Sequence, residues 1–281
     1  MLDDLKAFLG APFPWYLAPM GYQREMAGIA RRADQCAAAW HTHLAATKRL
    51  IEGAAERCDN RDTALIIGSG LLLDVPLEFL SGVFRRVILA DILHPRHVRH
   101  RLRRFDNVEP VQTDVTGVAK PVFDYVHKRR TGPLPTCRVE HFLDRRIDLV
   151  VSANLLSQLA VIPCRYLKAG LPGLPPHRIA GFGRSIVEAH LAWLRRFPGR
   201  VVLVTDFERE ERASDGRVER KNILEGVELP PCRTTWTWRI APLGRVYPDI
   251  DVRHRVAAYE DFGRVMSASS PPTAAAVQSS S

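Results

Sequence analysis

The segment Thr63–Asp74, with the sequence TALIIGSGLLLD, restricts the fold more than any other part of the chain. It begins as an unbroken apolar run, which is typical of a strand buried on both faces of a sheet. The run breaks at the Gly-Ser-Gly of positions 68–70, and Pro76 marks the start of an expected helix. A glycine turn at the carboxyl end of a buried parallel strand lets the backbone approach a nucleotide-like ligand closely.

Further apolar runs alternate with helix-like segments. Four more buried strands are expected, at Val87–Ala90, Val108–Thr113, Ile147–Val151 and Val201–Thr205. Helices are expected between the strands, at Pro76–Leu80, Pro95–Phe105, Val122–Lys128, the residues up to Leu159 and Ser185–Phe197. Such alternation builds a mostly parallel sheet flanked by helices, so we predict a Rossmann-like α/β fold.

The two ends of the chain differ from this middle part. Residues 23–57 contain no proline and many alanines, which predicts one or two helices; Trp40 in their apolar stripe is expected in the core, with a helical cap over a ligand site as the alternative. Thr234–Ile240 and Asp251–Tyr259 alternate enough to predict an antiparallel C-terminal strand pair that closes one sheet edge. We therefore divide the chain into a helical N-terminal extension (1–60), an α/β domain (61–265) and a disordered tail (266–281).

Two segments are expected to be irregular or exposed. Residues 162–183 hold four prolines and several glycines, and a long loop inside a compact domain is more often a lid than filler. Tyr166 and His177 on this segment are therefore candidates for substrate binding, with ordinary loop residues as the alternative. Residues 207–226 are rich in charge and are expected to form an exposed helix or loop.

Polar residues follow three successive strands. Asp91 comes after the second expected strand, Asp114 after the third and Asn154 after the fourth. The carboxyl ends of parallel strands meet at one sheet edge, which is where ligands bind in open α/β sheets. An acid about twenty residues past the glycine turn can accept hydrogen bonds from ribose hydroxyls, and Asp91 lies 23 positions after Gly68.

With these motifs, residues 63–205 resemble the class I S-adenosylmethionine-dependent methyltransferases, and the late antiparallel pair is similar to the last two strands of that family. The resemblance implies S-adenosyl-L-methionine as the cofactor and methyl transfer as the reaction. It also implies that Gly68, Ser69 and Gly70 lie beside the methionine part of the cofactor, that Asp91 binds the ribose, that Asp114 lies near the adenine amino group and that Asn154 lies close to the transferred methyl group.

The chain departs from the family pattern at the amino-acid end of the cofactor. The family often has an acid two residues before the first glycine, where this chain has Ile66, and Leu72 replaces the third glycine. Asp74 is our candidate for binding the ammonium group of the cofactor. The alternative is that Asp74 simply caps the following helix.

A nicotinamide-dinucleotide enzyme is the nearest structural rival, since it uses the same first strand and the same ribose acid. Its glycine pattern requires a third glycine where Leu73 stands, with a helix directly behind the turn for the pyrophosphate. Pro76 delays the helix here, and the final antiparallel strands fit the methyltransferase better.

The charge of the chain bears on the acceptor. Lys and Arg number 40 against 31 Asp and Glu, for a net charge of +9, and residues 95–105 form a dense basic segment that could contact phosphates or be a solvated helix face. No aromatic-basic RNA-binding module accompanies the segment. We therefore favour a small-molecule acceptor over RNA, and keep a non-enzymatic binding module as a third possibility.

Location and metal binding are also predicted. The five cysteines, odd in number and without a Cys-x-x-Cys pair, predict reduced thiols in the cytoplasm. The acidic start of the chain argues against export, and no apolar run approaches the ~20 residues that span a bilayer. No metal site is expected, because His94, His97 and His100 recur every three residues and drift apart around a helix.

Overall fold

The computed structural model describes residues 13–267, and most of the predicted tail lies outside them. At its centre is an eight-stranded sheet with the order β3-β2-β1-β4-β5-β8-β7, and β6 pairs with β5 off this path. The strands are β1 (Thr63–Ile67), β2 (Arg86–Asp91), β3 (Val108–Gln112), β4 (Leu149–Ala153), β5 (Arg200–Ala213), β6 (Val218–Asn222), β7 (Thr234–Ala241) and β8 (Ile250–Tyr259). Strands β1 to β5 pair in parallel, while β8 pairs antiparallel with β5 and with β7.

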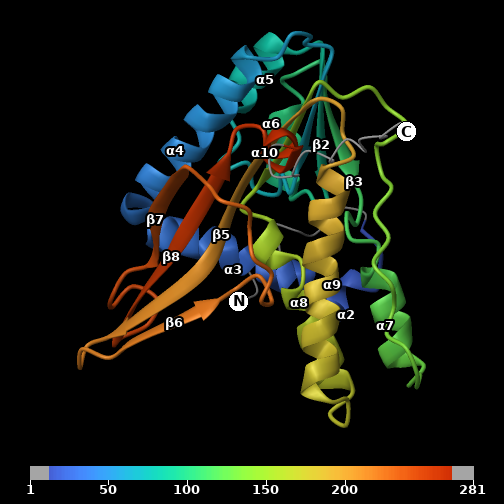
Figure 1. Ribbon diagram of the computed structural model, residues 1–281, viewed down its shortest axis with the longest axis vertical. Coiled ribbons are helices and arrows are strands. Elements are labelled where there is room, and N and C mark those ends of the chain that lie inside the picture. The colour runs from blue at the N-terminus through green and yellow to red at the C-terminus, as the bar shows by residue number, and fades with distance from the viewer. Residues whose placement is uncertain (1–12, 268–281) are drawn as a thin grey trace, which may run out of the picture.

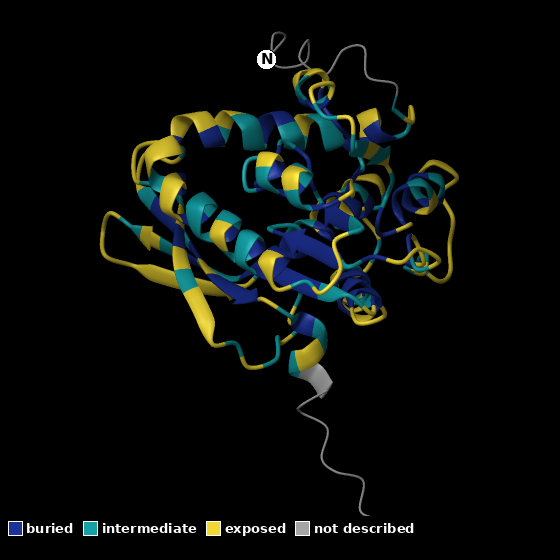
Figure 2. Ribbon diagram, turned by 90° about the horizontal axis from the view of Figure 1, so that it is seen from above, coloured by how far each residue is buried: buried dark blue, intermediate teal, exposed yellow. Residues whose placement is uncertain are grey.

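Helices cover both faces of this sheet (Figures 1 and 2). They are α2 (Leu17–Met20), α3 (Tyr22–Gln35), α4 (Ala37–Glu56), α5 (Leu77–Val83), α6 (Arg96–Leu102), α7 (Ala119–His127), the short 3₁₀ helix η1 (Leu156–Gln158), α8 (Val161–Gly170), α9 (Pro176–Leu194) and α10 (Phe262–Ser267). The predicted Rossmann-like fold with its antiparallel strand pair is confirmed, and so are the helices expected before residue 57.

The side-chain alternation of the strands assigns each helix to a face. In β1, Leu65 and Ile67 belong to a core shared with α2, α7, α8, α9 and α10, while Ala64 and Ile66 belong to a second core shared with α3, α4, α5 and α6. Successive side chains of a strand point to opposite faces, so a strand buried on both sides must be apolar throughout. The continuous apolar run of β1 follows from this position in the middle of the sheet.

The segment predicted as a lid loop is instead helical. Residues 162–183 lie mainly in α8 and α9. The first four N–H groups of a helix have no partner inside the helix, so proline is tolerated there. Pro163 is the third residue of α8 and Pro176 the first of α9. These prolines mark helix starts, and the expectation of a lid is wrong.

The charged segment at 207–226 is also different from the prediction. It forms the second half of β5, a turn at Gly216 with φ +89°, and β6. Figure 1 shows this β5–β6 arm projecting beyond the helices. Because the arm is polar on both faces, it lacks the apolar alternation by which a half-buried strand is recognised from sequence.

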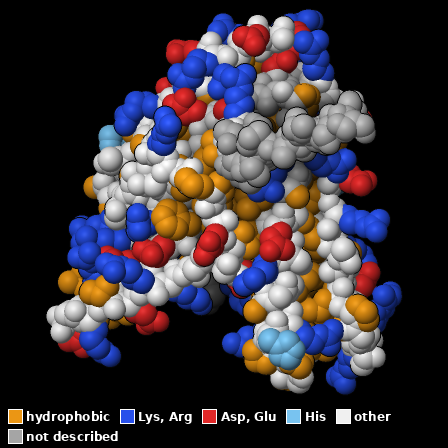
Figure 3. Space-filling model, in the orientation of Figure 1, with side chains coloured by type: hydrophobic (Ala, Val, Ile, Leu, Met, Phe, Trp, Pro, Cys, Tyr) orange, Lys and Arg blue, Asp and Glu red, His pale blue; other side chains and the backbone are white. Residues whose placement is uncertain are grey.

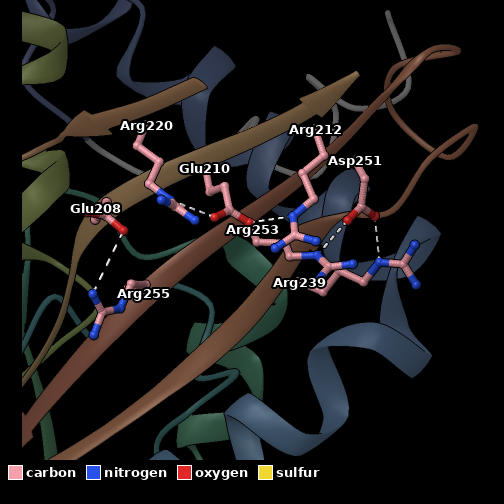
Figure 4. Close-up of polar contacts among 8 residues, drawn as sticks. All are labelled: Glu208, Glu210, Arg212, Arg220, Arg239, Asp251, Arg253 and Arg255. Carbon is pink, nitrogen blue, oxygen red and sulfur yellow. Dashed lines mark hydrogen bonds and ion pairs between the residues drawn. The ribbon is translucent and has the colours of Figure 1, made fainter. Parts of the chain in front are cut away.

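Ion pairs within and between strands are found on the arm and on the neighbouring strands β7 and β8 (Figure 4). The Glu210 carboxylate accepts hydrogen bonds from Arg212 at 2.5 Å and from Arg220 at 2.8 Å. Asp251 on β8 accepts from the Nε atoms of Arg239, at 2.5 Å, and Arg253, at 2.7 Å. Arg255 and Glu208 lie 4.0 Å apart. Opposite charges at paired positions thus replace apolar contacts as the link between these strands.

Candidate functional site

The glycine turn after β1 forms the floor of a pocket at the carboxyl edge of the parallel strands. Gly68 has φ +76° and Gly70 has φ +32°, in the left-handed region that glycine adopts without a steric penalty. A Cβ atom at Gly68 would lie 2.9 Å from Leu155 Cδ2. Leu72 also has a positive φ of 57°, and its N–H donates to the carbonyl of Ser69 at 2.8 Å. The chain can turn this tightly only because two of its positions lack a side chain.

Asp91, the last residue of β2, ties this turn to the sheet. Its Oδ2 atom accepts a hydrogen bond from the Gly70 N–H at 2.8 Å, and its Oδ1 atom accepts from the Leu93 N–H at 3.1 Å. Burial raises the pKa of Asp91 to about 6, although these backbone donors oppose the shift. A carboxylate has about four acceptor positions, so two remain for a ligand in the pocket that Asp91 lines.

Asp114 lies beyond the end of β3, also in the lining of the pocket. Its Oδ1 atom accepts from the N–H and the hydroxyl of Thr116, at 2.9 and 2.6 Å, and Oδ2 accepts from the N–H of Ala119 at 2.8 Å. Asp114 therefore holds the start of α7, where the free N–H groups of a helix favour a negative charge. Oδ2 retains capacity for one further donor.

Asp74 and Asn154 meet across the turn. Asn154 Nδ2 donates to Asp74 Oδ2 at 2.6 Å, and Asn154 itself has a positive φ of 53°. Helix α5 begins after Pro76 without a side-chain cap, so the alternative role of Asp74 as a helix cap is wrong. Asn154 Oδ1 is buried and has no hydrogen-bond partner among residues 13–267. Burial raises the pKa of Asp74, which the bond from Asn154 and the nearby Lys48 oppose.

Ser69 completes the turn. Its Oγ atom lies 3.0 Å from Nε2 of His94, and both residues are buried. Burial, together with the smaller effect of Arg99, lowers the pKa of His94 to about 4. Ser69 also lines the pocket. The contact between Ser69 and His94 holds the middle of the glycine turn, and the hydrogen bond from Gly70 to Asp91 holds its end.

The N-terminal helices and the last strands form the opposite wall. Trp40 and His43 of α4 and Trp238 and Ile240 of β7 line the pocket together with Met26 of α3. The Trp40 indole N–H donates to the carbonyl of Ile240 at 2.9 Å. Trp40 is 3% exposed, so it is a core residue, as expected, and it also belongs to a helical cover over the pocket.

The structure brings all seven predicted cofactor-site residues together and leaves the two predicted substrate residues apart. All seven predicted residues line the pocket: Gly68, Ser69, Gly70, Asp74, Asp91, Asp114 and Asn154. Tyr166 lies on α8, where its ring stacks on Phe123 with centroids 6.0 Å apart, and His177 is exposed in the first turn of α9. Neither lines the pocket; the part of α8 that does is its start, at Val161 and Ile162.

Several pocket residues were not predicted from sequence. His43 and Trp238 line the wall, and Asp206 and His254 lie buried next to them. One sequence signal could have indicated this wall. In the expected strand, Trp236 and Trp238 are two residues apart, which places both indoles on the same face of the sheet. Asp206 directly follows the strand expected at Val201–Thr205, just as Asp91 follows the one expected at Val87–Ala90. In the structure it lies inside β5, which is longer than the sequence predicts.

Two further properties concern the described residues alone. Across positions 13–267, no group of three or more His, Cys, Asp and Glu side chains is arranged to hold a metal ion. Among the helices of the same part of the chain, none combines the length and the apolar composition that crossing a membrane requires.

Comparisons with known proteins give fold similarities only. No family model matches the chain, and no curated protein matches it. The solved DhpI–SAM–HEP complex is 17% identical with a TM-score of 0.35, covering 87% of this chain and 99% of its own. A Burkholderia thailandensis 1,6-didemethyltoxoflavin N1-methyltransferase is 13% identical with a TM-score of 0.30, covering 90% and 94%. The 23S rRNA methyltransferase ErmE is 14% identical with a TM-score of 0.29, covering 76% and 69%. Because these TM-scores are low, we assign the fold of this protein from its own strand order and not from these similarities.

Proposed function

We propose that this protein is an S-adenosyl-L-methionine-dependent methyltransferase. The sheet has the order of the class I methyltransferase fold, with an antiparallel strand inserted beside β5. The observation that carries the proposal is Asp91, a buried carboxylate at the end of β2 that is bonded to the glycine turn and borders the pocket. This position suits hydrogen bonds from two neighbouring ribose hydroxyls.

The other lining residues fit the remaining parts of the cofactor. The free acceptor capacity of Asp114 suits an amino group of adenine. Asp74 and the unpartnered Oδ1 atom of Asn154 would both accept hydrogen bonds from the ammonium group, which has three donors. An ammonium ion there would also offset the burial of the Asp74 carboxylate, so Asp74 supplies the charge that Ile66 does not.

When bound, the cofactor supplies a methyl group on a positively charged sulfur. Much of the catalysis of such a transfer can come from alignment of the two reacting atoms. The left-handed backbone at Asn154 and the tight turn at Gly68 give the site one fixed shape. The cover of α3 and α4 limits the access of water.

A small molecule is the acceptor that the pocket supports best. Its outer wall is built from Ile29, Trp40, Leu44, Trp238 and Ile240, and such a wall suits an apolar or aromatic compound. Residues of α3 and α4 form one side of the pocket, which makes it a recess rather than a flat surface along which a polymer could lie. A cytoplasmic location belongs to the same proposal, supported by five cysteines that are all free.

RNA is the second candidate, because of the basic outer face of α6. Arg96, Arg103 and Arg104 are exposed there, as the sequence predicts, while Val98 and Leu102 are buried. The side of the molecule that Figure 3 presents offers no continuous basic patch, since acidic side chains are interspersed with basic ones there. A mixed surface gives weaker attraction to phosphates than a continuous basic patch does.

Calorimetric titration with S-adenosylhomocysteine and, separately, NADH tests the proposal. We expect S-adenosylhomocysteine to bind, and Asp91→Ala to weaken the binding at least tenfold, since the buried carboxylate can make two hydrogen bonds to the ribose. Asp106→Ala removes an exposed aspartate after α6 and is the matched control. Binding of NADH without any response to S-adenosylhomocysteine would contradict the methyltransferase assignment.

A further inference from the structure

We propose that Arg32 determines the specificity of the acceptor site, and that the acceptor is a small aromatic acid whose carboxylate binds this arginine. The inference rests on the proposed methyl transfer and adds to it a specificity-determining residue and a substrate class. It begins from the charges of the pocket. Within the part of the chain that the structure describes, Arg32 is the one lysine or arginine that lines the pocket, where Glu25, Asp74, Asp91 and Asp114 supply the opposite charge.

Helix α3 presents one face to the pocket. Its lining residues recur at the spacing of a single helix face and are Tyr22, Glu25, Met26, Ile29 and Arg32. Met26 lies over the glycine turn, since a Cβ atom at Gly70 would lie 3.8 Å from its Cε atom. Arg32 comes ~9 Å after Met26 along the helix axis, and its Nη1 atom lies 3.6 Å from the place of a Cβ atom at Gly28. The guanidinium therefore lies on the C-terminal side of Met26, beyond the glycine turn.

The Arg32 guanidinium is within reach of a ligand. The Arg32 side chain is 33% exposed. Across positions 13–267 it has one hydrogen-bond partner, Oε1 of Glu25, to which Nη2 donates over 3.5 Å, a long distance for such a bond. A guanidinium has five N–H donors in a planar fork, which matches the two oxygens of a carboxylate. Most of these donors are open to a ligand in the pocket.

Glu25 is shared between two arginines. Its Oε2 atom accepts a hydrogen bond from Nη1 of Arg165 on α8 at 3.1 Å, which is shorter than the contact of its Oε1 atom with Arg32. The two arginines and the one glutamate together have a formal charge of +1. A single carboxylate from a ligand would balance this charge, and it would bind Arg32 without breaking the bond between Glu25 and Arg165.

The cofactor has a carboxylate of its own, which must be distinguished from that of the acceptor. In the proposed function Asp74 binds the ammonium group of the cofactor, and in an amino acid the carboxylate is attached to the same carbon as the ammonium group. Burial raises the pKa of Asp74, and the charged side chain that opposes this shift is Lys48. Burial also raises the pKa of Asp91, to about 6, and backbone donors oppose it. Arg32 is thus the charged neighbour of neither carboxylate, which leaves it for the acceptor.

The apolar part of the pocket suits a ring. Several half-buried apolar side chains present surface to it: Met26, Ile29, Leu44 and Ile240. Trp40 and Trp238 complete this part and meet edge-on, with centroids 4.9 Å apart. Ligand pockets commonly combine apolar walls with a few polar groups that fix the orientation of the ligand. An aromatic ring buries much apolar surface with few rotatable bonds, so a ring against this wall with its carboxylate at Arg32 is the best match.

Two pairs of probes test the role of Arg32 by calorimetry in the presence of saturating S-adenosylhomocysteine. They are benzoate with benzamide and 2-naphthoate with 2-naphthamide. The two members of a pair have the same ring and nearly the same shape, and they differ in charge. We expect wild-type protein to bind one or both of the acids about fivefold more tightly than the corresponding amide, because a hydrogen-bonded pair of guanidinium and carboxylate is charge-assisted.

Three variants assign the preference for the acid to this site. Arg32→Gln should bind each acid no more tightly than its amide, with the affinity for the amide unchanged. Arg32→Lys retains the charge without the planar fork, so its preference should be intermediate. Glu25→Gln should bind the acid about threefold more tightly than wild type does, since it removes the carboxylate that competes for Arg32.

Arg24→Gln is the matched control. Arg24 is an exposed arginine in the first turn of α3 that does not line the pocket. Its variant loses the same charge and should keep the preference for the acid. A thermal melt checks that each variant is folded. Glu25→Gln decides the matter if Arg32→Gln is not folded, because loss of structure does not raise an affinity.

Three results would overturn the inference: no binding of any probe, equal affinities of wild type for acid and amide in both pairs, or a folded Arg32→Gln variant that keeps the preference. S-adenosylhomocysteine affinity is measured on the same samples. If Arg32→Gln weakens it and leaves the preference for the acid intact, Arg32 belongs to the cofactor site instead. If wild type binds S-adenosylhomocysteine without preferring the acids, the methyltransferase assignment stands and the acceptor class is wrong. Should S-adenosylhomocysteine fail to bind, the proposed function is wrong, and the inference that rests on it is wrong too.

Discussion

At the scale of single residues, the site depends on carboxylates that are bonded to the protein and also border the pocket. Asp91, Asp114 and Asp74 each accept hydrogen bonds from neighbouring backbone or side-chain donors while bordering the same pocket. Each carboxylate thus orders a nearby segment and still has capacity for a ligand. Structure and ligand binding share the same atoms, so a change at one of these residues affects both.

The pKa of Asp91 leads to a prediction about pH. Its value in the folded protein, about 6, is above the ordinary 3.8, so the stabilising contribution is complete below pH 3.8 and is lost as the pH rises through about 6. Asparagine does not ionise, so we expect the unfolding free energy of Asp91→Asn to fall less than that of wild type as the pH rises through about 6. The difference should reach up to about 3 kcal/mol, because the folded and unfolded pKa values differ by about two. Urea unfolding of both proteins at several pH values measures it.

Ligand affinity should change in the opposite direction. Since the ionised carboxylate is the better acceptor for ribose hydroxyls, the affinity of wild type for S-adenosylhomocysteine is expected to increase as the pH rises through about 6. Asp106→Asn should follow wild type in both measurements. An unfolding free energy with the same pH dependence in wild type and Asp91→Asn would refute the assigned role of burial.

At the scale of elements, the β5–β6 arm shows how strands form without a buried face. Glu210 links β5 to β6 through Arg220, and Asp251 links β8 to β7 through Arg239. Each of the two carboxylates also binds an arginine of its own strand (Figure 4). Asp251 is 7% exposed, so its two ion pairs are better shielded from solvent than an ordinary surface pair. The arm therefore depends on charge where the central strands depend on apolar burial.

The corresponding prediction concerns Asp251→Asn. Burial acts to raise the pKa of Asp251, but the bonds from Arg253 and Arg239 outweigh it and the pKa is lowered. Its stabilising effect is then present above pH 3.8 and lost as the pH falls through the lower folded value. We expect the variant to lose about 1 kcal/mol of unfolding free energy at pH 7, an amount discounted for the partly exposed arginines.

The control is Asp215→Asn, whose pair with Arg217 is exposed on both sides and should have little effect. Thermal melts at low and high salt distinguish the two sites. If the melting temperatures of both variants equal that of wild type at low salt, the ion pairs of Asp251 do not stabilise the pairing of β7 with β8.

At the scale of the whole molecule, the sequence predicts the central strands and helices better than it predicts the residues that form the outer wall of the pocket. The existence of β1 to β5 could be predicted from apolar runs such as Leu65–Ile67. Asp91, Asp114 and Asn154 could be placed on one edge because they directly follow the expected strands. The loop predicted at 162–183 from its prolines is wrong, because Pro163 and Pro176 lie in the first turns of helices. The pairing of His43 with Trp236 and of His254 with Asp206 could not be predicted, because it joins residues 193 and 48 positions apart through tertiary packing.

The basic face of α6 supplies a prediction at the same scale. With a small-molecule acceptor, replacing Arg96, Arg103 and Arg104 by Gln should leave S-adenosylhomocysteine binding unchanged and should also leave any RNA binding weak at moderate salt. With an RNA acceptor, the triple variant would lose affinity for a mixed RNA pool, and the slope of affinity against salt would decrease by about 2 to 3. Fluorescence anisotropy with labelled RNA measures both.

The bonds that join α4 to β7 bear on how the protein is made. Trp40 contacts Ile240 and Trp236 contacts His43, so the pocket wall unites residues 200 and 193 positions apart. During synthesis the first helices leave the ribosome long before their partner strand exists. The central strands can assemble earlier, but the pocket wall is complete only once β7 has been made, so chains that stop before Thr234 are expected to lack ligand binding.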